Sequence, residues 1–372
     1  MRSPLDEETL QASERISHVE VPDVMPALTI LYHRDPRRVG EVARLTALLH
    51  GGSESLSRVG PTFCAPGESA GRALADRFVS RNPVTLTQTG GDLTLTASAE
   101  GSAVTVDGAP LRGSVRVPAA HLEDGVVLEL GAHGVVLLLH LVPPVLNVLP
   151  PRLGLVGDNP AMERLRHEVT RVAGLTVSAL IQGETGTGKE LVARALHDAS
   201  PRRGQPCVCV NMATLPETLA ASELFGHVKG AFSGATHDHQ GYFARAHGGT
   251  LFLDEIGETP HAVQGMLLRA LETGEIQPLG ANKPQRVDMR VLAATDAKLD
   301  QAIADDRFSE ALLHRLAGYP LELPPLRARR DDIARLLFHF LDRELGALGR
   351  ASLLTPPETQ SRPWLSPALV AK

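Results

Sequence analysis

Residues 183–190 combine three glycines with a lysine directly after the apolar run 177–181, a pattern typical of a phosphate-binding loop. The segment reads Gly183, Glu184, Thr185, Gly186, Thr187, Gly188, Lys189 and Glu190. A glycine-rich turn between a buried strand and a helix lets backbone N–H groups face phosphate oxygens, and Lys189 adds a positive charge. The general pattern has Ser or Thr after the lysine to hold magnesium, whereas Glu190 stands here. The segment predicts binding of a nucleoside triphosphate.

A second chemical signal lies about 70 residues downstream, where the apolar run 251–253 ends in Asp254 and Glu255. The carboxyl ends of parallel strands meet at the ligand crevice of an α/β sheet. Asp254 is therefore a candidate ligand for Mg²⁺, directly or through water, and Glu255 a candidate to polarise the attacking water. The alternative is that the pair only caps a helix that starts near Thr259 and Pro260.

The elements that would position these residues fall into two regions of different character. Residues 25–142 contain short β-branched runs of period two separated by glycine turns, which predicts an all-β sandwich. From residue 153 to 326 strands alternate with helices, as in an α/β core. We expect residues 1–24 to form a mobile tail, 143–152 a Pro-rich linker, and 327–372 the start of a helical lid.

Composition restricts the classes of function. The chain has 372 residues and a net charge of −6, so no general basic surface indicates nucleic-acid binding. Three cysteines make neither a disulfide framework nor a four-ligand metal site. Cys207 and Cys209 alternate along an expected strand, and we expect both to be buried rather than to bind zinc. The absence of a signal peptide or an apolar run of membrane length favours the cytoplasm, with no membrane contact.

A third motif carries a family resemblance. Between Phe225 and Tyr242 lies the stretch Gly230, Ala231, Phe232, Ser233, Gly234 and Ala235. Core packing does not explain a Phe among such small residues, and we expect its side chain to be exposed. This stretch closely resembles the signature loop of bacterial enhancer-binding proteins, the AAA+ activators of sigma-54 RNA polymerase. The resemblance extends from about residue 153 to 333, and the family loop also ends in Gly-Lys-Glu, which accounts for Glu190. It implies ATP and Mg²⁺ as cofactors, a homo-hexameric ring and a sigma-factor contact through residues 230–235.

The β region resembles a forkhead-associated (FHA) domain, a reader of phosphothreonine peptides. The matching segments are residues 56–60, 79–82, 106–108 and 122–131. By this resemblance Arg58 and Ser80 hold the phosphate with Arg81 nearby, and Arg–phosphate hydrogen bonds are strong. The family histidine is Pro83 here, and the Asn of its Asn-Gly pair is Asp107, whose negative charge would weaken peptide binding. The alternative is a sandwich kept only for docking.

The α/β region departs from the family at a few positions. Asp296 replaces an Asn that can donate a hydrogen bond, and near the γ-phosphate an ionised Asp adds repulsion. Ser309 replaces the first of two family arginines, so Arg315 is the better candidate for a finger that reaches a neighbouring subunit. A solvated helix residue is the alternative for Arg315. Ser233 lacks the methyl group of the family Thr, and we expect a modest weakening there.

The C-terminal part of the sequence adds one more expectation. Up to residue 372 the sequence contains neither the second-sensor arginine nor the helix-turn-helix domain found in many family members. We therefore expect a truncated lid, and any DNA contact would depend on residues absent from this chain. The leading hypothesis is an ATP-hydrolysing regulator of sigma-54 holoenzyme with a phosphopeptide-sensing FHA-like domain. The alternative is a module that binds ATP and phosphopeptide with little or no hydrolysis.

Overall fold

The structure is a computed structural model that describes residues 24–66, 68, 70–81, 84–131, 134–143, 151–296 and 298–354. The chain divides into two compact units, Met1–Val148 with Ser352–Lys372, and Leu149–Ala351. Most of the expected tail and linker, Pro83, and the expected lid beyond residue 354 lie outside the described residues. We call the two units the β unit and the α/β unit and describe each by itself.

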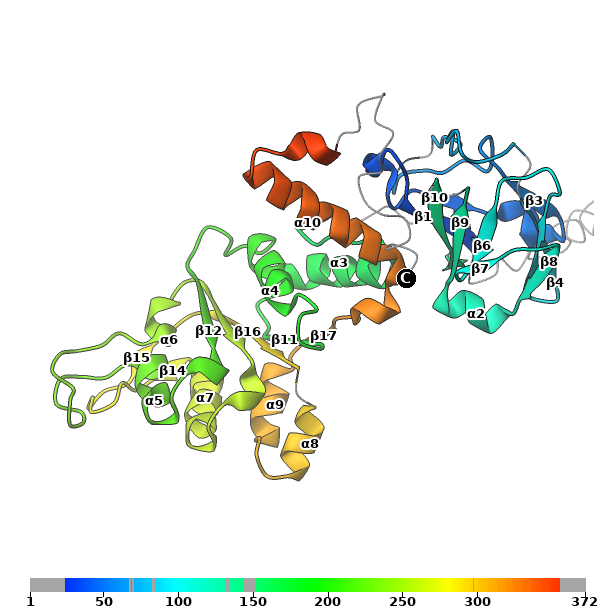
Figure 1. Cartoon of the computed structure of the whole chain (residues 1–372). Coiled ribbons are helices and arrows are strands. Elements are labelled where there is room, and N and C mark those ends of the chain that lie inside the picture. Colours follow the sequence, from blue (N-terminus) through cyan, green and yellow to red (C-terminus); the bar gives the residue numbers. More distant parts are fainter. Residues whose placement is uncertain are drawn as a thin grey trace, which may run out of the picture. The chain divides into compact units, whose positions relative to one another are not determined.

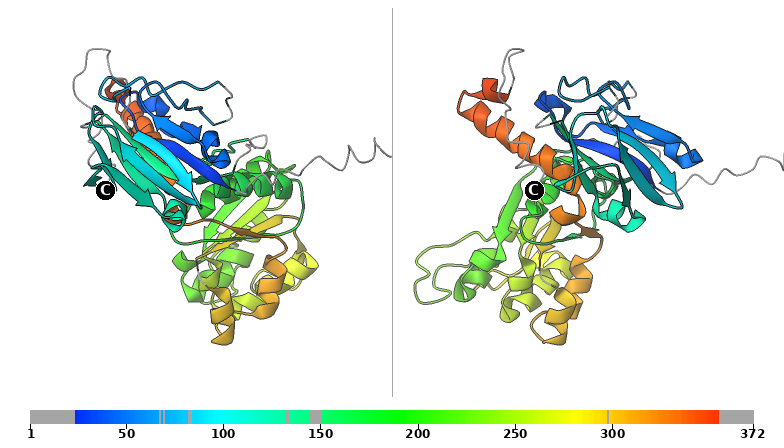
Figure 2. Two further views of the ribbon diagram at one scale, coloured as in Figure 1. Left: turned by 90° about the vertical axis from the view of Figure 1, so that its right-hand side faces the viewer. Right: turned by 45° about the vertical axis from the view of Figure 1, so that its right-hand side comes forward.

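The β unit is a sandwich of two antiparallel sheets (Figure 2). The six-stranded sheet has the order β2 (Val42–Arg44), β1 (Met25–Tyr32), β10 (Val135–Val142), β9 (Val126–Leu130), β6 (Val104–Val106) and β7 (Ala109–Pro110). The four-stranded sheet has the order β3 (Ser53–Leu56), β4 (Val84–Thr89), β5 (Asp92–Ala97) and β8 (Ser114–Val117). The short helix α2 (Ala119–Asp124) precedes β9.

Period-two patterning explains how these two sheets pack. On β4, Val84 and Leu86 are buried whereas Thr85 is exposed, and Leu86 pairs with the buried Leu95 of β5. These leucines share one hydrophobic core with residues of β1, β9 and β10 from the other sheet. Because successive side chains of a strand point to opposite faces, alternation of this kind buries one face of each sheet against the other. The strands of this region form the all-β architecture that the sequence predicts.

The α/β unit contains a five-stranded parallel sheet with helices on both faces (Figure 1). Its strand order is β12 (Cys207–Asn211), β13 (Thr250–Asp254), β16 (Arg290–Thr295), β11 (Ala179–Gln182) and β17 (Pro320–Glu322). The hairpin β14 (Glu275–Ile276) and β15 (Gln285–Arg286) stands apart from this sheet. The helices are α3 (Pro160–Ala173), α4 (Lys189–Asp198), α5 (Glu217–Phe225), α6 (Tyr242–Arg245), α7 (His261–Thr273), α8 (Leu299–Ala304), α9 (Glu310–Leu316) and α10 (Ile333–Ala347).

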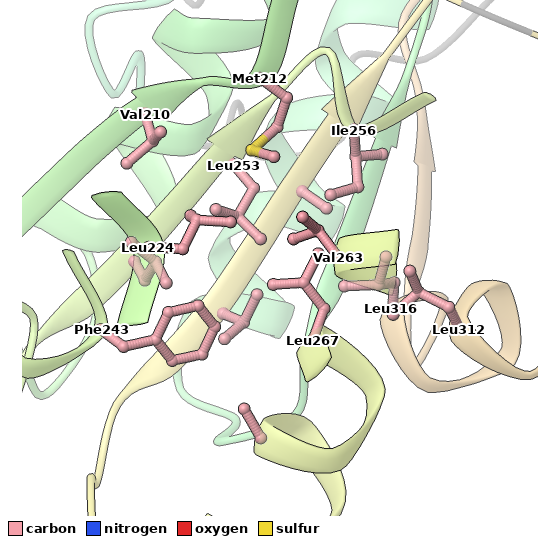
Figure 3. Packing of buried hydrophobic residues seen from close by; sticks show 14 of the residues in the cluster. Val210, Met212, Leu224, Phe243, Leu253, Ile256, Val263, Leu267, Leu312 and Leu316 are labelled. Carbon is pink, nitrogen blue, oxygen red and sulfur yellow. The ribbon is translucent and has the colours of Figure 1, made fainter. Parts of the chain in front are cut away.

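Two hydrophobic cores lie on opposite faces of this sheet. Leu251 and Leu253 of β13 pack into the core formed with α5, α7 and α9, part of which Figure 3 shows. Phe252, the residue between them, packs into the other core with α3 and α4. Burial on both faces explains why the central strands are apolar at nearly every position. The result is a rigid platform whose strands all end at one edge.

Two sequence expectations concern elements after β13 and after β17. A short 3-10 turn, Ile256–Glu258, follows Glu255, and α7 begins at His261, close to the expected helix start. The expected lid region from residue 327 contains α10, whose exposed apolar residues include Leu337 and Phe340. None of the helices within the described ranges is long and apolar enough to cross a membrane.

Candidate nucleotide site and contact surfaces

The phosphate loop connects the carboxyl end of β11 with the amino end of α4. Gly186 and Gly188 have φ angles of 81° and 101°, in the left-handed region that favours glycine. Gly183 lies against the backbone and Cβ of Leu323, where an added Cβ would approach Leu323 Cβ to 2.9 Å. The three glycines are thus required by the path of the loop, and the amino end of α4 directs free N–H groups toward it.

Lys189 is buried at the start of α4, and its ammonium group faces the loop. Its Nζ donates a hydrogen bond to the carbonyl of Gly183 at 3.0 Å and lies 3.5 Å from a carboxylate oxygen of Glu255. A buried ammonium needs partners of this kind because desolvation of a charge is costly. The structure thus brings together the lysine of the loop and the second carboxylate of β13, two features that are far apart in sequence.

Asp254 and Glu255 end β13 at the same edge of the sheet. The side-chain amide of Asn211, at the end of the adjacent strand β12, donates to Asp254 Oδ2 at 3.3 Å. Glu255 has a left-handed φ of 51°, which is uncommon for a residue with a side chain and often found at functional sites. Burial raises the pKa of Glu255, and the nearby Lys189 opposes this shift. Sequence reasoning missed Asn211, although its polar side chain at a strand end was a usable signal.

Asp296 follows β16 and lies beside the phosphate loop. Its carboxylate accepts a hydrogen bond from the hydroxyl of Thr185, and its backbone N–H donates to Glu255 Oε2 at 3.4 Å. The Thr185 hydrogen bond is the main cause that lowers the pKa of Asp296. Asp296 therefore places a negative charge in direct contact with the loop, close to the carboxylate of Glu255.

Two arginines that sequence reasoning left without a role also contact the loop. Arg327 donates two hydrogen bonds to the carboxylate of Glu184, at 2.7 and 2.6 Å. Arg329 donates to the carbonyl of Thr187 at 3.3 Å and to the sulfur of Met162 at 3.0 Å. The exposed Glu184 pair adds little to stability because solvent screens it. Both contacts nevertheless connect the chain between β17 and α10 to the phosphate loop.

Arg315 lies near the amino end of strand β11, whereas the phosphate loop lies at the carboxyl end of this strand. Its guanidinium donates to the carbonyl of Leu271 at 3.0 and 2.7 Å, and its own carbonyl accepts from the hydroxyl of Ser178 at 2.8 Å. Ser178 precedes β11, whereas the loop follows it. Arg315 is exposed and borders a cavity of about 330 Å³. Within one chain, the structure does not bring Arg315 to the other site residues.

The segment from Gly230 to Ala235 forms a turn between α5 and α6 that extends away from the sheet (Figure 1). The N–H of Gly230 donates to the carbonyl of Ala235 at 2.9 Å, which closes the turn. Phe232 is 39% exposed, and its ring contacts the edge of His227 at a centroid distance of 5.0 Å. An exposed aromatic ring at the tip of a turn suits a contact with another molecule.

This turn is anchored to the segment that joins β14 and β15. Val228 donates its N–H to Leu279 at 3.0 Å, and Leu279 donates to Gly226 at 2.9 Å. An added Cβ on Gly280 would approach the Cβ of Ala231 to 2.9 Å. The base of the Phe232 turn is therefore held by backbone contacts, whereas the tip itself remains exposed.

The candidate phosphopeptide residues of the β unit lie together in part. The N–H of Arg58 donates to the carbonyl of Ser80 at 3.0 Å, and Arg81 follows at an exposed position. The N–H of Ser80 donates to the hydroxyl of Ser102 at 3.1 Å. The carboxylate of Asp107 accepts from the N–H of Val127 at 2.8 Å, so it connects the β6–β7 turn to β9.

The expected burial of Cys207 and Cys209 is wrong, because both side chains are exposed. They do share one face of β12, as their spacing requires. However, β12 is the edge strand of the sheet, so no further strand shields it. Val208 and Val210 face the core on the other side. No group of three or more His, Cys, Asp or Glu that could hold a metal ion occurs in the described ranges.

Comparisons with known proteins agree with the geometry of the α/β unit. Residues 155–322 match the family model described as the Sigma-54 interaction domain. The chain is 49% identical over 208 residues to the anaerobic nitric oxide reductase transcription regulator NorR of Aeromonas salmonicida (strain A449), covering 56% of this chain and 41% of the relative. It is 48% identical over 211 residues to the DNA-binding transcriptional regulator NtrC of Escherichia coli (strain K12), covering 57% and 45%.

Among solved structures, NtrX from Brucella abortus in complex with ADP is similar at a TM-score of 0.50 and 34% identity, covering 58% of this chain and 48% of that one. The chain spans less than half the length of the curated relatives it matches. Over residues 155–322 the α/β unit is thus similar to the Sigma-54 interaction domain, and in sequence the chain is similar to the transcription regulators NorR and NtrC. The residues matched by the family model all lie in the α/β unit.

Proposed function

We propose that this chain is an ATP-dependent transcription regulator that hydrolyses ATP to remodel sigma-54 RNA polymerase holoenzyme. One observation carries the proposal. A phosphate loop with its lysine and a carboxylate pair meet at one edge of a sheet, in the same unit as an exposed aromatic turn. The first arrangement suits triphosphate chemistry, and the second suits contact with a partner that moves with the nucleotide state.

The site residues fit ATP and Mg²⁺. The amino end of α4 and the left-handed glycines leave N–H groups of the loop open to phosphate oxygens, and Lys189 supplies the charge. Asp254 is only partly buried at a strand end and is oriented by Asn211, so its carboxylate is open to Mg²⁺. Bound Mg²⁺ would neutralise charge that develops on the phosphate oxygens. Glu190 leaves the Ser/Thr ligand of the general pattern without a counterpart.

Glu255 would orient and deprotonate the attacking water. Its raised pKa makes it a better base than an ordinary Glu, while Lys189 at 3.5 Å favours its ionised form. ATP would compete for Lys189, and the carboxylate would then be free to face water. The left-handed backbone at Glu255 sets the direction of its side chain relative to Asp254.

We propose that the active form is a ring, a homo-hexamer, in which Arg315 acts on the neighbouring subunit. Its position at the sheet edge away from its own loop supports a role in trans, because a side chain there faces outward from the unit. Its bonds to Leu271 would be exchanged for phosphate contacts on assembly. A finger of this type contributes about 10³–10⁵ in rate in related chemistry.

The turn 230–235 would supply the sigma-factor contact, with Phe232 and Ser233 at its tip. The contact of Phe232 with His227 is an edge-to-face ring pair, which is worth only about 0.5–1.5 kcal/mol. A partner surface can therefore displace it. The backbone anchors at residues 226–228 would transmit the position of the helices to the tip.

We further propose that the β unit reads a phosphothreonine peptide through Arg58 and Ser80, with Arg81 nearby. The hydrogen bond between the backbones of Arg58 and Ser80 supports this role, because it brings two separate loops together. The bond from Val127 to Asp107 gives the Asp107 carboxylate a structural role. The test is a phosphopeptide array with fragment 25–145, and binding should be lost with Arg58→Ala but kept with Arg112→Ala.

The decisive experiment for the main proposal is remodelling of sigma-54 holoenzyme on promoter DNA by the chain with ATP. Phe232→Ala should retain ATP hydrolysis within about twofold and abolish remodelling, since an exposed tip adds little to folding. Leu175→Ala, which removes another exposed apolar side chain of this unit, is the control and should retain both activities. Full remodelling by Phe232→Ala would refute the proposed contact.

A second candidate function is a module that binds ATP and phosphopeptide with little or no hydrolysis. The contact between Asp296 and Thr185 favours it, because a negative charge occupies the edge of the phosphate site. Ser309 adds to this candidate, since it replaces the first family arginine and instead accepts a hydrogen bond from Leu312 as the N-cap of α9. Absence of turnover together with tight ATP binding would select this function over the first.

A further inference from the structure

Cys207 and Cys209 form an exposed pair of thiols on the edge strand β12. Both belong to the face of the strand opposite Val208 and Val210, as the two-residue period of a strand requires. The pair thus presents two sulfur atoms side by side to solvent. We call it the β12 dithiol.

Charged groups of both signs surround the β12 dithiol. The neighbouring Cys207 thiol lowers the pKa of the Cys209 thiol to about 7, and Arg194 on α4 acts in the same direction, whereas burial and the charges of Glu190 and Asp254 oppose this shift. The Cys209 thiol in turn raises the pKa of Cys207. Arg194 itself forms an ion pair with Asp198 at 3.8 Å. An anionic complex at the dithiol would therefore lie near a guanidinium group.

Geometry opposes a disulfide between these two residues. Residues i and i+2 of an extended strand have Cα atoms roughly 6.6–6.8 Å apart. This is the upper limit of the usual Cα separation in disulfides. β12 is paired in register with β13 along its whole length, so the strand cannot shorten without breaking that ladder. A ligand that spans two separate sulfur atoms fits the pair better than a direct bond.

The ligand class follows from the number of available donors. Structural zinc needs four ligands, and within the described residues no set of three or more His, Cys, Asp or Glu side chains could hold a metal ion. Two thiolates alone suit a soft monovalent cation. We propose that the β12 dithiol binds one Cu(I) ion through both sulfur atoms. Two S–H bonds break, two Cu–S bonds form, two protons go to solvent, and no electron is transferred.

The site would lie close to the proposed nucleotide site. Asn211 continues the same face of β12 two residues after Cys209, and its amide donates to Asp254. Relative to two neutral thiols, the bound form carries one net negative charge. The binding proposal itself is independent of ATP hydrolysis, so the two can fail separately.

The test uses the full chain, reduced and free of oxygen, titrated with Cu(I) against a chromophoric Cu(I) chelator. We expect one Cu(I) per monomer to be withdrawn from the chelator. Cys207→Ser and Cys209→Ser should each lose this withdrawal, whereas Cys64→Ser, the matched control in the β unit, should retain it. Retention of one Cu(I) by either of the first two variants, or loss in the control, would overturn the proposal.

A second measurement needs only the parent protein and so does not depend on how the variants fold. One equivalent of Cu(I) should protect Cys207 and Cys209 of the folded chain from alkylation, as read by peptide mass spectrometry. Cys64 should remain reactive, which is read after the chain is unfolded in the presence of excess chelator. Equal labelling of the two cysteines with and without Cu(I) would contradict the site. So would a Cu(I)-dependent dimer with one ion per two chains in size-exclusion chromatography, because it would place the sulfur ligands on different molecules.

Discussion

Replacing Asp296 by Asn should tighten ATP binding and raise turnover. Asp296 is exposed at the end of β16, accepts a hydrogen bond from Thr185, and lies next to Glu255. An Asn side chain has the same shape and keeps an oxygen for Thr185, so the loop contact survives. The change removes one negative charge beside the site at which triphosphate would bind.

The size of the effect follows from Coulomb's law. Two unit charges about 5 Å apart repel by about 3 kcal/mol at an effective dielectric of about 20, and by about 0.8 kcal/mol in bulk water. Because Asp296 is largely solvent-exposed, the value lies between these limits. This corresponds to about a 4-fold to 150-fold gain in ATP affinity. A gain in turnover of similar size requires that repulsion grows as charge develops on the transferred phosphoryl group.

Calorimetric ATP titration and initial-rate ATPase measurements at two salt concentrations would test this reasoning. The control is Asp305→Asn, which removes the same charge at the exposed end of α8, where Asp305 pairs with Arg307. The gain in Asp296→Asn should shrink at high salt, whereas the control should resemble the parent throughout. Unchanged affinity in Asp296→Asn at low salt would refute the electrostatic account of this position.

Further predictions concern other residues of the α/β unit. Lys189→Ala should weaken ATP binding about tenfold or more in calorimetry, and parental affinity would contradict its phosphate contact. Glu255→Gln should lower turnover about 10²–10⁴-fold while ATP stays bound. In the parent, acidification should lower the rate of hydrolysis at a higher pH than expected for an ordinary Glu, because burial raises the pKa of Glu255. Arg315→Ala should be inactive alone but recover activity when co-assembled with Glu255→Gln; co-assembly without recovery would argue against action in trans. Burial raises the pKa of Asp332 from 3.8 to about 7, so the stability that its protonation contributes is fully present below about pH 4 and is lost as the pH rises through 7. The parent should therefore lose about 1 kcal/mol of stability between pH 6 and 8 in chemical denaturation, and an equal loss in Asp332→Asn would disprove this origin.

The packing of β4 and β5 in the β unit could be predicted because buried and more exposed residues alternate along them, whereas β1 and β10 are buried along almost their whole length. Val84, Leu86, Leu93 and Leu95 point inward on paired strands, and the threonines between them do not. The two-residue strand β7, Ala109–Pro110, could not be predicted, since two residues have no period. Its existence depends on the left-handed turn that precedes it, which pairs it with β6.

The residues of the candidate nucleotide site could be picked out where they are local in sequence. Lys189 belongs to one continuous motif and the Asp254–Glu255 pair to another, and strand order alone brings them together. The contact between Asn211 and Asp254 could not be derived in the same way, because it requires β12 to be the neighbour of β13. The exposure of Cys207 and Cys209 has the same origin. Alternation shows which residues share a face, but not whether the strand lies at the edge of its sheet.

Sheet topology also decides what Arg315 can do. The four-residue strand β11 spans roughly 10–13 Å, with the backbone of Arg315 bonded next to its amino end and the phosphate loop attached to its carboxyl end. The guanidinium is also turned toward Leu271 of α7, away from that loop. A contribution of Arg315 to hydrolysis within its own chain would require α9 to leave a core in which Leu312 and Leu316 are fully buried. Presentation to a second subunit requires only a change of side-chain rotamer. If the chain assembles as the proposed ring, a loss of hydrolysis in Arg315→Ala would therefore report on the interface between subunits.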